Sequence, residues 1–174
     1  LALVTGGGRG IGAAVARQLG HKGYEVCLTY ERDAEAAQVV VGAICGAGGV
    51  AWSCHLDIAS PESVHALFQA LDQRPAPLAL LVNNAGITEG FSRLETLSYA
   101  RLEHVFQVNV FGSFLCAREA VRRMGRSHGG VGGAIVHPPS RAAALGGGAA
   151  WVHYAATTGA YHSLTLAPGP LVAR

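Results

Sequence analysis

The sequence opens with the apolar run Leu1 to Val4 and continues directly into Thr5-Gly6-Gly7-Gly8-Arg9-Gly10-Ile11-Gly12. Apolar residues then recur at helical spacing, at Ile11, Val15 and Leu19. This order predicts a buried strand, a glycine turn and a helix. The free backbone N–H groups and the dipole of a helix N-terminus favour a pyrophosphate, and glycine allows it to approach closely. Taken alone, the stretch is also compatible with a plain turn.

Length and composition indicate one soluble α/β domain that covers residues 1–174. Half of the residues are hydrophobic, 14% are charged and 24 are glycine. A net charge of +2 without a basic run does not indicate nucleic acid, so we expect no such partner, and no apolar run reaches the roughly 18 residues of a membrane span. The cysteines lack metal-ligand spacing, so we expect no metal site and reduced, mostly buried thiols in a cytoplasmic protein: Cys27, Cys45, Cys54 and Cys116.

Strand and helix patterns alternate along the chain. Short apolar runs, typical of parallel strands covered on both faces, occupy residues 2–5, 25–30, 50–56, 78–83 and 134–137. Helical segments are expected near residues 11–21, 33–46, 61–73, 98–125 and 151–166. Asp33 and Ser60 suit N-caps, and Gly23 and Gly48 suit helix stops. Right-handed crossovers then predict a doubly wound, Rossmann-like parallel sheet with strand order 3-2-1-4-5.

Several motifs, in this order, resemble those of the short-chain dehydrogenase/reductases, in particular the bacterial sugar- or steroid-dehydrogenase-like and ketoacyl-reductase-like members. The resemblance covers nearly the whole chain. Its motifs are the glycine turn, Asp57 after the third strand, Asn83-Asn84-Ala85-Gly86 after the fourth, Asn109 in a helix, and Ser140 fourteen residues before Tyr154.

The resemblance implies hydride transfer between a nicotinamide cofactor and the carbonyl or alcohol carbon of a small molecule. It assigns the proton transfer to Tyr154, the substrate oxygen to Ser140, and a supporting role to Asn109. The cofactor would lie against Gly6, Arg9, Gly10, Ile11, Gly12, Tyr30, Asp57, Asn84, Ala85 and Gly86.

Plainer interpretations stay open for some of these positions. Asp57 also suits the entry of a helix, and Asn83-Asn84 also suits a polar strand end that satisfies backbone groups. His137 and His153 flank the expected site, but we interpret both as polar edge residues rather than bases.

Three departures from the family pattern bear on activity. Thr158 stands where the family has a lysine that lowers the pKa of the tyrosine and binds the nicotinamide ribose. The adjoining prolines Pro138 and Pro139 are expected to displace Ser140. Residues 167–172 resemble a segment that follows a sixth strand in complete members, so we expect a sheet truncated after the fifth strand and a C-terminally incomplete domain.

The second strand ends in Tyr30, where NAD-preferring members carry an acid. Arg9 and Arg32 suit a 2′-phosphate, whereas Glu31 would repel it, so we expect NADP, with NAD less favoured.

The helix over residues 98–125 carries more apolar surface than one sheet face covers, and by the resemblance we expect a homodimer or homotetramer: Phe106, Val110, Phe114 and Leu115. The plainer interpretation is that these side chains are core. A hypothesis of another class also remains: a non-catalytic nucleotide-binding or degenerate fragment.

Overall fold

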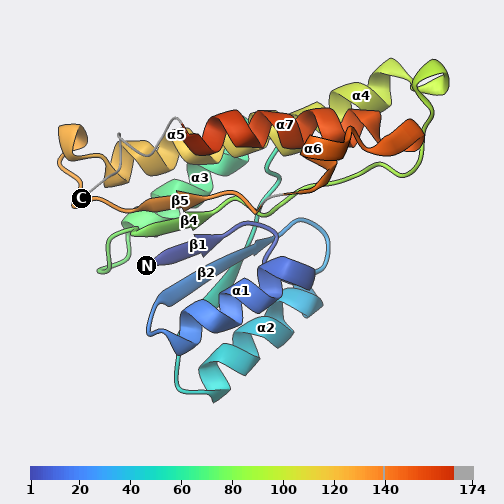
Figure 1. Cartoon of the computed structure of the whole chain (residues 1–174). Helices are drawn as coiled ribbons and strands as arrows, with labels where there is room; N and C mark the ends of the chain where they lie inside the picture. The colour runs from blue at the N-terminus through green and yellow to red at the C-terminus, as the bar shows by residue number, and fades with distance from the viewer. Residues whose placement is uncertain (139, 167–174) are drawn as a thin grey trace.

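The computed structural model describes residues 1–138 and 140–166. Pro139 and the segment 167–174, on which two of the expected departures fall, lie outside the described residues. One parallel sheet forms the centre, in the order β3-β2-β1-β4-β5 (Figure 1). Its strands are β1 (Ala2–Val4), β2 (Glu25–Tyr30), β3 (Val50–His55), β4 (Leu80–Val82) and β5 (Ala134–Val136). The predicted fold class and strand order are confirmed.

Helices connect the strands and cover both faces of the sheet. The longer ones are α1 (Gly10–His21), α2 (Ala34–Gly46), α3 (Pro61–Asp72), α4 (Tyr99–Phe106), α5 (Gly112–Met124) and α7 (Val152–Leu166). Short segments are η1 (Leu94–Thr96), the π turn η2 (Gln107–Phe111), η3 (Arg126–His128), α6 (Ala142–Leu145) and η4 (Gly148–Ala150).

The predicted helix ends are set by local chemistry. Asp33 Oδ1 accepts a hydrogen bond from the N–H of Ala36 at 2.9 Å, and Ser60 Oγ accepts one from that of Ser63 at 3.1 Å. Gly23 and Gly48 follow α1 and α2 with φ of +83° and +84°, the left-handed conformation that ends a helix. These caps fix where α1, α2 and α3 meet the sheet.

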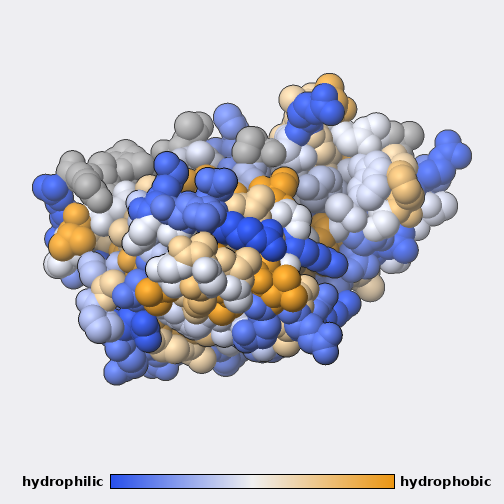
Figure 2. Space-filling model, turned by 90° about the horizontal axis from the view of Figure 1, so that it is seen from below, coloured by the Kyte–Doolittle hydropathy of each residue, from blue (hydrophilic) through white to orange (hydrophobic). Residues whose placement is uncertain are grey.

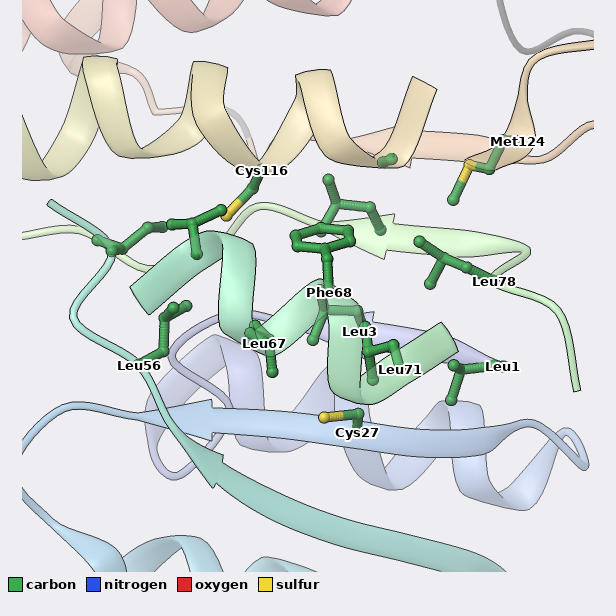
Figure 3. Packing of buried hydrophobic residues seen from close by; sticks show 14 residues of the cluster. Leu1, Leu3, Cys27, Leu56, Leu67, Phe68, Leu71, Leu78, Cys116 and Met124 are labelled. Atoms are coloured by element: carbon green, nitrogen blue, oxygen red, sulfur yellow. The ribbon is translucent and has the colours of Figure 1, made fainter. Parts of the chain in front are cut away.

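Two hydrophobic clusters hold the layers together. On one face α1 and α2 pack against the sheet, and on the other face α3 and α5 do so. Phe68 of α3 is fully buried and lies between α5 and the strands, close to Leu3, Leu71 and Leu78 (Figure 3). Burying a side chain of this size contributes about 1.5–3 kcal/mol.

The structure corrects several expectations. Ile11 is 66% exposed, and the buried face of α1 is instead formed by small residues and Leu19, because the helix lies close to the sheet. The helix expected over 98–125 contains the π turn η2, where the side chain of Asn109 binds Ile87 in the loop after β4. His137 and His153 are buried, at 6% and 2% exposure, and not polar edge residues. Among the thiols, Cys45 is exposed and Cys54 half-buried.

No helix within residues 1–138 and 140–166 combines the length and apolarity that a membrane span requires. The same residues hold no group of three or more potential metal-ligating side chains from His, Cys, Asp and Glu.

Candidate functional site

The carboxyl ends of the parallel strands share one edge of the sheet, and the candidate residues gather there. The turn after β1 is anchored by Thr5, which is fully buried. Thr5 Oγ1 accepts hydrogen bonds from the N–H groups of Asn84 and Ala85, each at 3.0 Å. Gly6 donates its N–H to Oγ1 of Thr29 at 3.2 Å. The turn is therefore fixed to both neighbouring strands.

Glycine is required in this turn for two separate reasons. Gly6 and Gly10 have φ of +64° and +56°, a conformation that other residues rarely adopt. Gly12 lies so close to the turn that a Cβ there would overlap the carbonyl oxygen of Gly6 and lie 2.5 Å from Nδ2 of Asn84. The turn keeps this shape only without these side chains, and it leads directly into the N-terminus of α1, an arrangement that fits a pyrophosphate.

Asn84 connects the turn to the end of β4. Its Nδ2 donates to the carbonyl oxygens of Thr5 at 2.9 Å and Gly6 at 3.0 Å. Asn83 is buried, and its Nδ2 donates to the carbonyl of Ser113 in α5 at 3.0 Å. Both amides thus satisfy backbone groups, which is the structural role the sequence left open for them.

The side chains expected near the adenosine half of a dinucleotide are accessible. Asp57 is exposed, and its Oδ1 accepts the N–H of Ala59 at 3.0 Å in a turn that precedes α3. Tyr30 is half-buried, with its ring edge-on to His55 at 5.9 Å between centroids. Arg9 is exposed directly before α1. Arg32 is exposed too, but its Nε forms an ion pair with Glu31 at 3.3 Å.

Asn109 is bonded to α7, the helix that carries Tyr154 and Thr158. It is fully buried in the π turn, where its Oδ1 accepts the N–H of Ile87 and its Nδ2 donates to the carbonyl of Ile87, both at 2.8 Å. Nδ2 also donates to Oγ1 of Thr157 in α7 at 3.0 Å. A Cβ on Gly86 would lie 3.2 Å from Oδ1 of Asn109. One amide therefore joins the loop after β4 to the helix that carries Tyr154.

Helix α7 carries Tyr154 and Thr158 one turn apart. Tyr154 is half-buried, and the ring of Trp151 stands edge-on to it at 6.2 Å. Thr158 is only 3% exposed, and its hydroxyl donates to the carbonyl of Ala155 at 2.8 Å. The hydroxyl of Thr158 is thus engaged within its own helix rather than free to reach a ligand.

Ser140 and Thr158 line one pocket of about 640 Å³ between β5, α6 and α7. Ser140 Oγ accepts the N–H of Ala142 at 3.2 Å. Within the described part of the chain no hydrogen bond links Ser140 to Tyr154. The structure therefore places Ser140 and Thr158 in one pocket and bonds Asn109 to α7, the helix of Tyr154. Among the described residues no hydrogen bond connects Ser140 with Asn109 or Tyr154.

The same pocket contains two residues that the sequence did not single out as a pair. The rings of His137 and Tyr161 stack at 5.7 Å between centroids with 24° between their planes. Burial lowers the pKa of His137 to about 4 and raises the pKa of Tyr161 to about 12. Both rings are therefore neutral near pH 7, and neither supplies the charge that a lysine at position 158 would carry. Because the two residues are far apart in the sequence, no local sequence signal predicts that they stack.

Known proteins of one family are similar to this chain over most of its length. The family model described as short chain dehydrogenase matches residues 1–169. The chain is 48% identical over 165 residues to the oxidoreductase YgfF of Escherichia coli, covering 95% of this chain and 67% of that protein. It is 38% identical over 137 residues to a short-chain type dehydrogenase/reductase of Picea abies, covering 75% of this chain and 51% of the relative.

Among solved structures, a short chain dehydrogenase from Burkholderia cenocepacia in complex with NADP is similar, with a TM-score of 0.87 and 35% identity. That match covers 98% of this chain and 69% of the other. The chain thus spans about half to two thirds of the length of these relatives.

Proposed function

Since the chain belongs to the short-chain dehydrogenase family, we propose that it transfers a hydride between NADP(H) and a small carbonyl or alcohol substrate. The observation that carries this proposal is the glycine turn, whose shape depends on the absence of a Cβ at Gly12 and on the amide of Asn84. The turn, the first turn of α1 and Asn84-Ala85-Gly86 would hold the cofactor. When bound, the nicotinamide supplies or accepts the hydride.

The chain's own residues then have the following roles. Tyr154 exchanges a proton with the substrate oxygen, and the hydroxyl of Ser140 binds that oxygen. Asn109 is the positioning residue, because its amide binds both the backbone of Ile87 and the hydroxyl of Thr157 in one network. At position 158 threonine supplies no charge, so we propose that turnover is weak.

NADP is favoured over NAD by the charges at the end of β2. Tyr30 replaces the acid that would bind both ribose hydroxyls, and Arg9 is exposed beside the turn with no ion pair among the described residues. Arg32 contributes less, since Glu31 already neutralises it at 3.3 Å. Arg9 is therefore the side chain that we propose for the 2′-phosphate.

Arg9→Ala is expected to weaken NADPH binding about tenfold or more and to leave NADH binding nearly unchanged, because a charge-assisted hydrogen bond contributes about 1.5–3 kcal/mol. Fluorescence titration of the purified chain with each cofactor measures both effects. Lys22→Ala removes an exposed positive charge at the other end of α1 and serves as the control. Equal losses for both cofactors would show that Arg9 does not recognise the phosphate.

Thr158 also supports a second function, nucleotide binding without catalysis. Without a cation at this position, the chain is also consistent with a nucleotide-binding protein that does not catalyse. Binding of NADPH together with no turnover of any ketone would select this alternative, whereas no binding of either cofactor would contradict both functions.

We further propose a single cytoplasmic domain that associates as a homodimer or homotetramer. Val110 is only 8% exposed and belongs to the core, which is the plainer interpretation of that side chain. Phe111 and Phe114, however, are 51% and 48% exposed on the layer that contains α5. On the opposite face, over α1 and α2, hydrophobic side chains lie in separate groups among hydrophilic ones (Figure 2).

Phe114→Asp is therefore expected to lower the mass of the assembly toward that of one chain, because a charge at a buried contact is costly. Light scattering at micromolar concentration measures this change. Val39→Asp, at a 66% exposed position of α2, is the matched control and should leave the mass unchanged. A monomeric parent protein would refute the proposed association.

A further inference from the structure

Two thiols that play no part in the proposed reaction lie against each other inside the sheet. Cys27 on β2 and Cys54 on β3 have their Sγ atoms 3.9 Å apart, and the thiol of Cys27 donates a hydrogen bond to Sγ of Cys54. In the parallel ladder Cys27 pairs with Trp52, so Cys54 is two residues further along β3 and on the same face of the sheet. The pair is therefore set by strand register and not by a mobile loop.

The two thiols differ in access. Cys27 is fully buried, and Figure 3 shows its side chain on β2 in the cluster that contains Leu67 and Leu71. Cys54 is half-buried on β3, which lies at the edge of the described sheet beside β2. A small oxidant can therefore reach Cys54 before Cys27.

The surroundings of Cys54 favour its thiolate. The hydrogen bond from Cys27 lowers the pKa of Cys54, while that bond and burial raise the pKa of Cys27. The guanidinium of Arg74 lies 4.4 Å from the ring centre of Trp52, next to the pair, and its ion partner is Glu25 at 3.3 Å. Partial exposure and nearby donors are the features of reactive cysteines.

The other two cysteines provide an internal comparison. Cys45 is exposed, but its thiol donates to the carbonyl of Ala51 at 3.7 Å and has no thiol partner among the described residues. Cys116 is buried, and burial raises its pKa to about 12. Cys54 alone among the four joins partial exposure with a hydrogen bond from a second thiol.

We propose that Cys27 and Cys54 form a redox-sensitive pair that a peroxide converts to a disulfide. The Cys54 thiolate attacks one peroxide oxygen, the O–O bond breaks, and Cys54 becomes a sulfenic acid as hydroxide leaves and is protonated to water. The Cys27 sulfur then attacks the sulfenic sulfur, an S–S bond forms, and the displaced hydroxide takes the Cys27 proton to leave as a second water. Two thiols lose two electrons, and hydrogen peroxide becomes two waters.

Closing the bond requires the two sulfurs to move from 3.9 Å to about 2.05 Å. Because Cys27 is fixed in the core, most of this movement falls on Cys54 and the edge strand. The reaction is therefore expected to be specific to the folded chain, in which β3 is held beside β2.

The test treats the reduced, folded chain with hydrogen peroxide and follows the intact mass and the peptides. We expect loss of two hydrogen atoms, a link between the peptides of Cys27 and Cys54, and reversal by dithiothreitol. Cys54 should react at least about tenfold faster than the exposed Cys45, since the thiolate is the attacking form. Cys45→Ser is the control and should form the link at the parental rate.

Cys54→Ser changes a half-buried edge position and should abolish the link without disturbing the core. Cys27→Ala should leave Cys54 with added oxygen and no link. Oxygen addition at Cys54 of the parent chain without loss of hydrogen would overturn the pairing. Faster oxidation of Cys45 than of Cys54, or an equally fast link in denaturant, would overturn the proposal that the fold creates the site.

Discussion

Gly12→Ala is expected to lower the affinity for NADPH by at least about tenfold, because the added Cβ distorts the turn that we propose as the cofactor site. The added Cβ would overlap the carbonyl oxygen of Gly6 and lie 2.5 Å from Nδ2 of Asn84. Either the turn or the amide must then move, and overpacking of this kind costs about 1–3 kcal/mol. Fluorescence titration with NADPH measures the affinity, and thermal unfolding measures the accompanying loss of stability.

Two further alanine variants separate close approach from general effects of replacing glycine. Gly42 lies within α2 with open space around it, so Gly42→Ala should keep NADPH binding and stabilise the helix by about 0.5–1 kcal/mol. Gly10→Ala meets no protein atom within 4 Å but must adopt φ of +56°, so its thermal unfolding without cofactor reports backbone strain without overlap. Parental NADPH affinity in Gly12→Ala would show that the turn is not the cofactor site.

The central sheet could be predicted from the sequence because its signals are local. Strands covered on both faces are continuous apolar runs, and the intervening helices carry their own caps, as at Asp33 and Ser60. The glycine turn then fixes which strand lies at the centre of the sheet. Some predicted strands extend one or two residues beyond the hydrogen-bonded strand in the structure, as at Leu78 before β4.

Other features depend on contacts between distant residues and left no local signal. The π turn at Asn109 exists where an amide binds Ile87, 22 residues earlier, and Thr157, 48 residues later. Helical periodicity does not record such a partner. Ile11 was predicted to be core because it matches the spacing of α1, but the helix packs through small side chains and leaves it exposed.

The site itself was predictable to different degrees. The family resemblance singled out Ser140 and Tyr154, fourteen residues apart. The structure places Ser140 in a pocket with Thr158, and among the described residues Ser140 forms no hydrogen bond with Tyr154. His137 stacks on Tyr161 because the end of β5 lies beside α7. The sequence around either residue does not predict this contact. The catalytic and cofactor-binding roles of the candidate residues stay predictions.

Thr158→Lys is expected to raise NADPH oxidation by about thirtyfold or more with a suitable ketone. A phenol of ordinary pKa about 10 needs a shift of roughly three units, about 4 kcal/mol, to exchange protons near neutral pH. If a lysine ammonium supplies half of that free energy, the proton step becomes about thirtyfold faster. The pocket of about 640 Å³ that Thr158 lines gives the longer side chain room, and the neutral His137 beside it does not compete for the charge.

Matched variants decide whether charge at this one position is responsible for the gain. Thr158→Met adds a side chain of similar length without charge, and Thr165→Lys adds the same charge further along α7 at the wall of the same pocket. Assays of each variant with a panel of ketones and ketoacyl thioesters should show the gain for Thr158→Lys alone. An equal gain for Thr158→Met would assign the effect to packing, and rapid turnover by the parent chain would refute the premise. If instead no variant gains while all bind NADPH, Thr158 is not what holds turnover low. The next feature to test is then the pair Ser140 and Tyr154, which no hydrogen bond joins in the part of the chain that the structure describes.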